Sequence, residues 1–207
     1  MFCRKRMEQL KDNIALIGMP GCGKSSLGVV LAKALGYKFV DSDLLIQERE
    51  GKLLNEIIEQ DGLDTFKKIE EEVNSSIKTS KTVIATGGSV VYGPAAMAHL
   101  RDIATVVYLK LPLEEIASRL GDLNQRGVAL QPGQTLAELY DERIPLYEKY
   151  ADLIIDITDM DIRQSVAELI SQTIDTVSDE TISERVEDLQ KKSDEVVDET
   201  KKSAECS

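Results

Sequence analysis

The sequence predicts a three-layer α/β fold, in which a five-stranded parallel sheet lies between two layers of helices. Two features predict it. Short apolar runs rich in β-branched residues alternate along the chain with segments of helical periodicity. In addition, a glycine-rich loop suited to phosphate binding joins the first apolar run to the first helical segment. Such an alternation of strand and helix favours a parallel sheet with helices on both faces.

The expected elements follow one another in a regular order. Five apolar runs are the expected strands, at residues 14–17, 39–40, 83–85, 106–109 and 154–157. Five segments have the spacing of helices, at residues 25–35, 53–58, 65–76, 113–120 and 136–147. Together they predict one domain at residues 13–175, which follows an N-terminal extension at residues 1–12.

Two segments interrupt the pattern. Residues 121–135 are rich in Gly, Asn, Gln and Pro, which predicts a mobile lid between two helices. Residues 176–207 hold ten acidic and five basic residues and no aromatic residue. They predict an acidic tail, helical or disordered, which is either a solvated appendage or a docking helix for a partner or a second copy.

Composition limits the classes of partner. The 207 residues carry a formal net charge of −12, which repels nucleic acids and anionic membranes, so we expect neither as a partner. Any anion-binding site must then depend on a few local cations. Cys3, Cys22 and Cys206 lie far apart, which indicates a reducing compartment rather than disulfides or a zinc site. With no signal-peptide or membrane-spanning run, we expect a cytoplasmic monomer that acts on small molecules.

The strongest chemical signal is Gly18–Ser25, whose sequence GMPGCGKS matches the P-loop pattern G-x-x-x-x-G-K-[ST] at every fixed position. Glycines let such a loop fold around phosphate oxygens, with backbone N–H groups and the next helix N-terminus pointing at them. Lys24 adds positive charge at the β and γ oxygens, and the Ser25 hydroxyl is a candidate Mg²⁺ ligand. We interpret Cys22 as a small packing residue rather than a redox group. The predicted ATP-binding residues of this segment are Gly21, Cys22, Gly23, Lys24, Ser25 and Ser26.

Two carboxylates follow the second expected strand, in the triplet Asp41-Ser42-Asp43. If the chain is still extended there, side chains two residues apart point to the same side. Ligands bind at the carboxyl ends of parallel strands, so we predict that both carboxylates face the phosphate loop, with Asp41 at the metal and Asp43 at an acceptor hydroxyl. Alternatively, one of them caps a helix that begins near Leu44.

Glycines and arginines complete the candidate site. The third strand ends in Thr86-Gly87-Gly88-Ser89, where glycines permit close approach of a ligand, although a tight turn explains them equally well. Three arginines in or beside the expected lid are candidates to neutralise a transferring phosphoryl group, or else are surface charges: Arg119, Arg126 and Arg143.

In order and spacing these motifs resemble the shikimate kinases. The resemblance covers residues 13–170 and includes two more segments, Phe66–Glu72 (FKKIEEE) and Arg143–Tyr147 (RIPLY). It implies a nucleoside-monophosphate-kinase-like P-loop fold. It also implies Mg²⁺-dependent transfer of the γ-phosphoryl group of ATP to a hydroxyl of shikimate, in aromatic amino acid biosynthesis.

The resemblance implies roles for individual residues. Arg119 is expected to lie against adenine, and Arg126 to come down with the lid as a catalytic residue beside Lys24. Asp43 is expected to hydrogen-bond the acceptor hydroxyl and help to deprotonate it. The residues expected to bind the acceptor are Asp43, Lys67, Gly87, Gly88 and Arg143.

Three residues depart from the family pattern. Lys67 stands in place of a second carboxylate-binding arginine, and an ammonium cannot grip a carboxylate in the bidentate way. Ser89 replaces a third glycine, which predicts a smaller or more polar acceptor pocket. Gly127 follows Arg126 where proline is usual, which predicts a more flexible lid.

Two other functions stay open because the same scaffold hosts many acceptors. One is a kinase for another small hydroxy acid or polyol, such as gluconate or homoserine. The other is a non-catalytic nucleotide-binding module, which the complete P-loop motif disfavours.

Overall fold

The computed structural model describes residues 11–120, 129–131 and 133–173 of the chain. The expected lid falls mostly outside this part, and Arg126 with it. The expected tail at residues 176–207 also lies outside the described residues.

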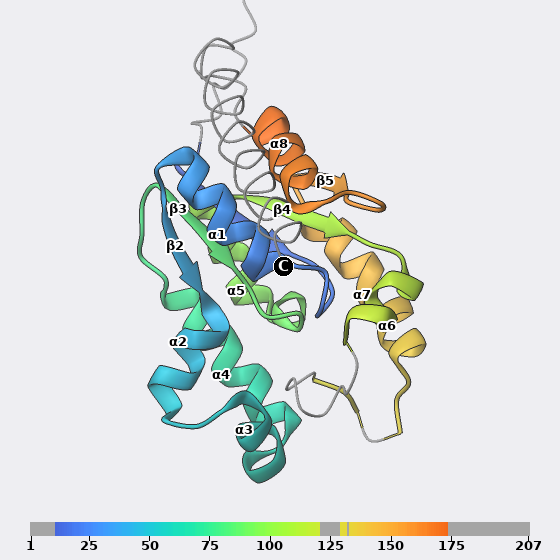
Figure 1. The fold of residues 1–207 in the computed structure, drawn as a ribbon. Coiled ribbons are helices and arrows are strands. Elements are labelled where there is room, and N and C mark those ends of the chain that lie inside the picture. The colour runs from blue at the N-terminus through green and yellow to red at the C-terminus, as the bar shows by residue number, and fades with distance from the viewer. Residues whose placement is uncertain (1–10, 121–128, 132, 174–207) are drawn as a thin grey trace, which may run out of the picture.

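Five parallel strands form a single sheet in the order β2-β3-β1-β4-β5 (Figure 1). The strands are β1 (Asn13–Ile17), β2 (Lys38–Asp41), β3 (Thr82–Ala85), β4 (Ala104–Lys110) and β5 (Leu153–Asp156). Each contains one of the apolar runs that the sequence singles out, apart from a difference of one or two residues at its ends. The predicted five-stranded parallel sheet is therefore confirmed.

Helices connect and cover the strands. Those of the described residues are α1 (Lys24–Leu35), α2 (Ser42–Glu50), α3 (Leu54–Asp61), α4 (Leu63–Ser76), the 3₁₀ helix η1 (Val90–Tyr92), α5 (Pro94–Ile103), α6 (Leu113–Leu120), α7 (Leu136–Tyr150) and α8 (Ile162–Thr173). The five expected helical segments correspond to α1, α3, α4, α6 and α7, whereas α2, α5 and α8 were not among them. α5 starts with Pro94. Proline is common in turns, but it also suits the first position of a helix. None of the helices in the described ranges could cross a membrane, because none is both long and apolar enough.

The main core surrounds β1, which is buried along its whole length at the centre of the sheet. A parallel strand covered on both faces is apolar throughout rather than alternating, which explains the run Ile14–Ile17. Helices α1 and α8 cover one face of the sheet, and α5 and α7 lie on the other (Figure 1). The three-layer prediction is thus confirmed.

Helices α2, α3 and α4 form a lobe at the β2 side of the sheet (Figure 1). The lobe has a small core of its own, formed by Ile46, Ile57, Phe66, Val73 and Ala129. Ala129 lies within the expected lid at residues 121–135, so this core joins the lobe to a described residue of that segment. Packing of apolar side chains from distant segments makes the lobe a fixed wall facing the phosphate loop.

Candidate active site

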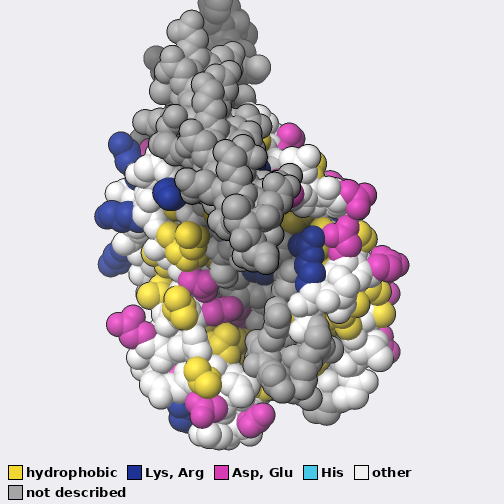
Figure 2. Space-filling model, viewed as in Figure 1, with side chains coloured by type: hydrophobic (Ala, Val, Ile, Leu, Met, Phe, Trp, Pro, Cys, Tyr) yellow, Lys and Arg dark blue, Asp and Glu magenta, His cyan; other side chains and the backbone are white. Residues whose placement is uncertain are grey.

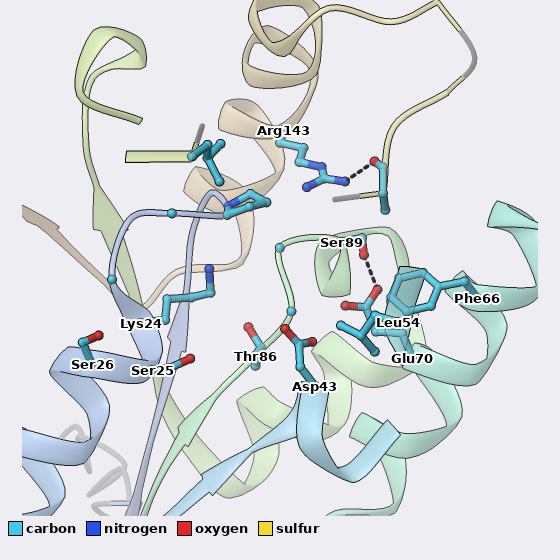
Figure 3. Close-up of a pocket in the computed structure, with 17 residues that line it drawn as sticks. Lys24, Ser25, Ser26, Asp43, Leu54, Phe66, Glu70, Thr86, Ser89 and Arg143 are labelled. Carbon is cyan, nitrogen blue, oxygen red and sulfur yellow. Dashed lines mark hydrogen bonds between the residues drawn. The ribbon is translucent and has the colours of Figure 1, made fainter. Parts of the chain in front are cut away.

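A cavity of about 350 Å³ opens between the phosphate loop and the α2–α4 lobe, at the carboxyl ends of the strands (Figure 3). In parallel α/β sheets this edge is where ligands bind. The cavity is lined by Pro20, Gly21, Gly23, Lys24, Ser25, Ser26, Asp43, Leu54, Phe66, Glu70, Thr86, Gly87, Gly88, Ser89, Leu120, Ala129 and Arg143. It therefore brings together residues from the P-loop, the aspartate triplet, the glycine run and α7, as the sequence predicts.

The phosphate loop connects β1 to α1. Gly21 has φ 80°, and a Cβ there would lie 2.9 Å from the Leu120 side chain, so the loop needs glycine for both conformation and space. Lys24 is buried, and its Nζ donates to the carbonyl oxygens of Gly18 at 2.8 Å and Met19 at 2.9 Å. The ammonium is thereby held inside the loop. Cys22 is fully buried in the main core, as expected of a packing residue.

A second cavity, of about 460 Å³, lies on the other side of the phosphate loop. Gly21, Gly23 and Ser26 line both cavities. The rest of its wall comes from Cys22, Leu27, Arg119, Ile157, Met160, Asp161, Ile162 and Ser165. A nucleotide fits this arrangement, because its phosphates can occupy the loop while its base reaches the second cavity beside Arg119. Arg119 pairs with Glu115 at 2.9 Å and is exposed.

The aspartate triplet does not have the geometry that we expected. The chain is extended only to Asp41 and is helical from Ser42, so the prediction of two carboxylates on one side of a strand is wrong. Asp41 is the N-cap of α2, and its Oδ1 accepts a hydrogen bond from the backbone N–H of Asp43 at 3.0 Å. Capping satisfies one of the free N–H groups at the start of a helix, which fixes this geometry.

Only Asp43 of the two aspartates lines the cavity, from the first turn of α2. Its Oδ1 is buried and has no hydrogen-bond partner among the described residues. The pKa of Asp43 is raised to about 6, first by burial and then by the negative charge of Asp41, while Lys24 opposes the shift. The cavity therefore contains a carboxylate that is ionised at neutral pH and able to accept a proton.

A second carboxylate, Glu70 on α4, lies opposite the first (Figure 3). It is buried, and its Oε2 accepts a hydrogen bond from the Ser89 hydroxyl at 2.6 Å. Its Oε1 has no partner among the described residues. The pKa of Glu70 is raised to about 7, because the effect of burial and of the Asp43 charge exceeds the lowering by Ser89, Arg143 and Lys24.

Gly87 lies between the two carboxylates. A Cβ on Gly87 would stand 2.2 Å from Glu70 Oε1 and 2.7 Å from Asp43 Oδ1. Both oxygens therefore approach the same point above the backbone, within reach of one small molecule. The predicted acceptor-site role of Gly87 has a physical basis in this close approach.

Arg143 supplies the cation of the cavity from α7. The side chain is fully buried, its Nη2 donates to the Ala129 carbonyl at 2.9 Å, and its Nε donates to the Tyr92 hydroxyl at 3.3 Å. Its Nη1 has no partner among the described residues. One turn further along α7, the Tyr147 hydroxyl donates to the Gly88 carbonyl at 2.6 Å and ties the helix to the glycine run.

Lys67 does not line the cavity, although we expected it to bind the acceptor. Its ammonium lies 4.3 Å from the centroid of the Tyr92 ring, a favourable cation–π distance. Phe66 and Glu70, four residues apart, share the cavity-facing side of α4, and Lys67 is one position further round the helix. Only Arg143 of these two cations lines the cavity, although its guanidinium lies 5.2 Å from the centroid of the same Tyr92 ring.

Four residues that shape the site were not on the predicted list: Phe66, Glu70, Tyr92 and Tyr147. Phe66 and Glu70 carry a signal in sequence, because an aromatic residue and a carboxylate at positions i and i+4 occupy the same helix face. Tyr147 stands in the segment that resembles the family. For Tyr92 no sequence signal exists, since its contacts come from α4 and α7.

Replacing Gly87 with alanine is expected to lower kcat/KM about 100-fold with the fold retained, because the new methyl group must push both carboxylates out of place. Steady-state kinetics with a circular dichroism spectrum of the variant checks this. Gly93→Ala is the control, since a Cβ there lies 3.0 Å from Cβ and Cγ of Glu71 and crowds neither carboxylate of the cavity. Equal activity of Gly87→Ala and the control would show that the two carboxylates are not needed at their present positions.

On the face that Figure 2 shows, most described Lys and Arg side chains gather at the upper left, and Asp and Glu side chains are spread over the rest, so no broad basic region is visible. The net charge of −12 also gives the protein no long-range attraction for anions. The local cations Lys24 and Arg143 are both buried, so they act at short range in a medium that screens little. Selection of an anionic ligand therefore depends on the cavity rather than on long-range attraction.

Comparisons with known proteins agree with this geometry. A family model described as shikimate kinase matches residues 20–174. A shikimate kinase of Clostridium botulinum is 39% identical over 147 residues, which are 70% of this chain and 88% of that protein. A shikimate kinase of Thiobacillus denitrificans is 40% identical over 161 residues, 76% of this chain and 85% of that protein.

Solved structures lead to the same family. The shikimate kinase of Acinetobacter baumannii, solved in complex with shikimate, has a TM-score of 0.69 at 33% identity and is matched over 81% of this chain and 94% of its own. A deoxyadenosine kinase from M. mycoides, with a TM-score of 0.51 at 15% identity, shares the fold alone. Since the family model spans most of the chain and the relatives are matched over most of their own lengths, this chain belongs to the shikimate kinase family.

Proposed function

We propose that the protein is an ATP-dependent kinase that phosphorylates a hydroxyl of shikimate to form shikimate 3-phosphate, in the cytoplasm and as a monomer. One observation carries the choice of acceptor. The cavity beside the phosphate loop contains three buried atoms without a hydrogen-bond partner among the described residues: Arg143 Nη1, Asp43 Oδ1 and Glu70 Oε1. Buried polar atoms are normally paired, so such atoms indicate a ligand that supplies the missing partners.

The missing partners define the chemistry of the acceptor. A guanidinium N–H requires an acceptor oxygen, and a carboxylate is the best one. Two carboxylate oxygens require hydrogen-bond donors, and hydroxyl groups supply them. The cavity therefore suits a small molecule with one carboxylate and at least two hydroxyls, which describes shikimate.

The roles of the residues follow from these pairings. Arg143 holds the carboxylate of the acceptor, and Asp43 accepts the proton of the hydroxyl as its oxygen forms a bond to the γ-phosphorus and the bond to ADP breaks. Lys24 neutralises charge on the phosphate oxygens during transfer. Arg126 is proposed to add a second positive charge when the nucleotide is bound, and Arg119 to lie against adenine.

Mg²⁺ would be held mainly by phosphate oxygens and water, as is usual for this cation. Ser25, exposed in the first turn of α1, presents its hydroxyl to the cavity beside Lys24 and suits direct ligation. Asp41 uses Oδ1 as a helix cap, so only Oδ2 is free of that bond and able to hold a water of the metal shell. When bound, Mg²⁺ supplies charge neutralisation between the phosphates.

An ADP-release assay over shikimate, gluconate and homoserine tests the proposal. We expect turnover with shikimate and a product heavier by one phosphoryl group. Arg143→Lys should raise the KM for shikimate at least about tenfold, because an ammonium cannot keep the bonds to Ala129 and Tyr92 and still offer a donor at the place of Nη1. Arg101→Lys, an exposed arginine on α5, is the control. If ADP release were fastest with gluconate or homoserine, that compound would be the acceptor and not shikimate.

A kinase for a different hydroxy acid is the second candidate, because Lys67 pairs with Tyr92 instead of lining the cavity. The acceptor carboxylate is then left with a single buried cation. If shikimate is the acceptor and Lys67 helps to bind it, Lys67→Arg should lower its KM. If Lys67→Arg lowered the rate with every acid in the panel, the site would require lysine at position 67 for its own acceptor.

A further inference from the structure

A buried hydrogen bond at the acceptor end of the cavity joins elements that are far apart in the chain. Ser89, between β3 and η1, donates through Oγ to Oε2 of Glu70 on α4 at 2.6 Å (Figure 3). Both side chains are buried. Within the described ranges, no other side chain hydrogen-bonds to the Glu70 carboxylate. The orientation of this carboxylate therefore depends on one hydroxyl.

The orientation matters because of where the other oxygen lies. With Oε2 engaged by Ser89, Oε1 is directed to the backbone of Gly87, where Asp43 Oδ1 also lies. Each oxygen is buried and lacks a partner among the described residues. Two neighbouring hydroxyl groups on one molecule could each donate to one of these oxygens. In this chain the Ser89 hydroxyl holds Glu70 in this orientation, and glycine or alanine at position 89 would lack the donor.

We propose that Ser89 is a positioning residue that selects the hydroxyl pattern of the acceptor, by holding Glu70 so that Oε1 binds a second hydroxyl beside the one that Asp43 deprotonates. The proposal rests on the kinase function proposed above and adds a requirement to it. An acceptor with only one hydroxyl would leave Glu70 Oε1 buried and unpaired, which weakens binding.

The charged groups around Glu70 make its ionisation a measure of this contact. Asp43 faces it from α2, Lys24 from α1 and Arg143 from α7. Burial raises the pKa of Glu70, and the hydrogen bond from Ser89 opposes this rise, so that the pKa is about 7 with the hydrogen bond in place. Removing the hydroxyl should raise the pKa further, so that Glu70 becomes protonated at a higher pH and accepts a hydroxyl less well.

Steady-state kinetics of Ser89→Ala with shikimate gives the first test. We expect the KM for shikimate to rise about tenfold, with kcat and the KM for ATP unchanged. In the pH profile of kcat/KM for shikimate, the acid limb should move to higher pH. In a Glu70→Gln background the same substitution should have no further effect. Ser171→Ala, at an exposed serine on α8, is the control.

A shikimate analogue that lacks the hydroxyl next to the phosphorylated one makes the test specific. Wild type and Ser89→Ala should bind this analogue equally, because the analogue has no second hydroxyl that could donate a hydrogen bond to Glu70 Oε1. A rise in KM that is as large for the analogue as for shikimate would overturn the proposal, and so would an unchanged KM for shikimate.

A titration of the ligand-free protein separates this proposal from the kinase function. In protein with ¹³C-labelled glutamate carboxyl groups, the Glu70 resonance is the one that is lost in Glu70→Gln. Its midpoint should lie near neutral pH in wild type and at higher pH in Ser89→Ala. Absence of shikimate turnover would refute the proposed function alone, whereas an unchanged midpoint in Ser89→Ala would refute the role of Ser89.

Discussion

Replacing Lys24 with alanine is expected to lower kcat about 1,000-fold while the fold is retained. The phosphates would lose a fixed positive charge at the point where negative charge must be redistributed during transfer. Lys24 is buried and held by two loop carbonyls, so its ammonium needs no reorganisation before the reaction. An ADP-release assay at saturating ATP and acceptor measures the loss.

Two comparisons make the Lys24 result interpretable. Lys33→Ala removes an exposed lysine from the last turn of the same helix and should leave kcat unchanged. A thermal unfolding curve of Lys24→Ala should resemble that of wild type, because the side chain of Lys24 contributes two hydrogen bonds to a loop that glycine geometry already fixes. If Lys24→Ala kept activity within tenfold of wild type, the assignment of the phosphate site would be wrong.

Replacing Asp43 with asparagine is expected to lower kcat by a factor on the order of 100 to 10,000, with the KM for ATP almost unchanged. The amide keeps the shape of the side chain and removes its charge and basicity. Because the pKa of Asp43 is raised to about 6, the wild-type base is ionised above that pH and is lost as the pH falls through it. The kcat/KM of wild type for the acceptor should therefore decline below about pH 6.

The matched control for Asp43 is Asp64→Asn, which changes an exposed aspartate in the first turn of α4 in the same way. It should leave both kcat and its pH dependence as in wild type. An Asp43→Asn enzyme with wild-type kcat would remove Asp43 from the proton transfer. A large loss that persisted with an unchanged KM for ATP would place it there.

Several parts of the fold follow from the sequence because they depend on local backbone preference. Apolar runs predicted all five strands, although only β1, β3 and β4 are largely buried, and the edge strands β2 and β5 expose some residues. The P-loop was predictable residue by residue, because its glycines and Lys24 act on neighbours a few positions away. α5 and α8 were not among the expected helices: α5 begins with a proline, and α8 carries many polar residues.

The acceptor end of the site was less predictable, and the aspartate triplet shows why. An extended chain and a helix that starts at Ser42 are both compatible with the residues Asp41-Ser42-Asp43. Our main prediction took the extended chain, with a helix cap as the alternative. The structure has the helix, and Asp41 is its cap. The choice depends on packing of the α2–α4 lobe, to which Ile46 of α2 contributes a buried side chain.

What the sequence by itself determined is the class of the protein: the strand order along the chain, the phosphate loop and the family, all of which reside in short contiguous segments. What only the tertiary structure decided is the pairing of distant side chains. It joined Ser89 to Glu70, placed Arg143 in the cavity, and assigned Lys67 to the ring of Tyr92 instead. The physical reason is that the burial and orientation of a polar side chain depend on which other elements pack around it. The spacing of residues along one element contains no information about those neighbours.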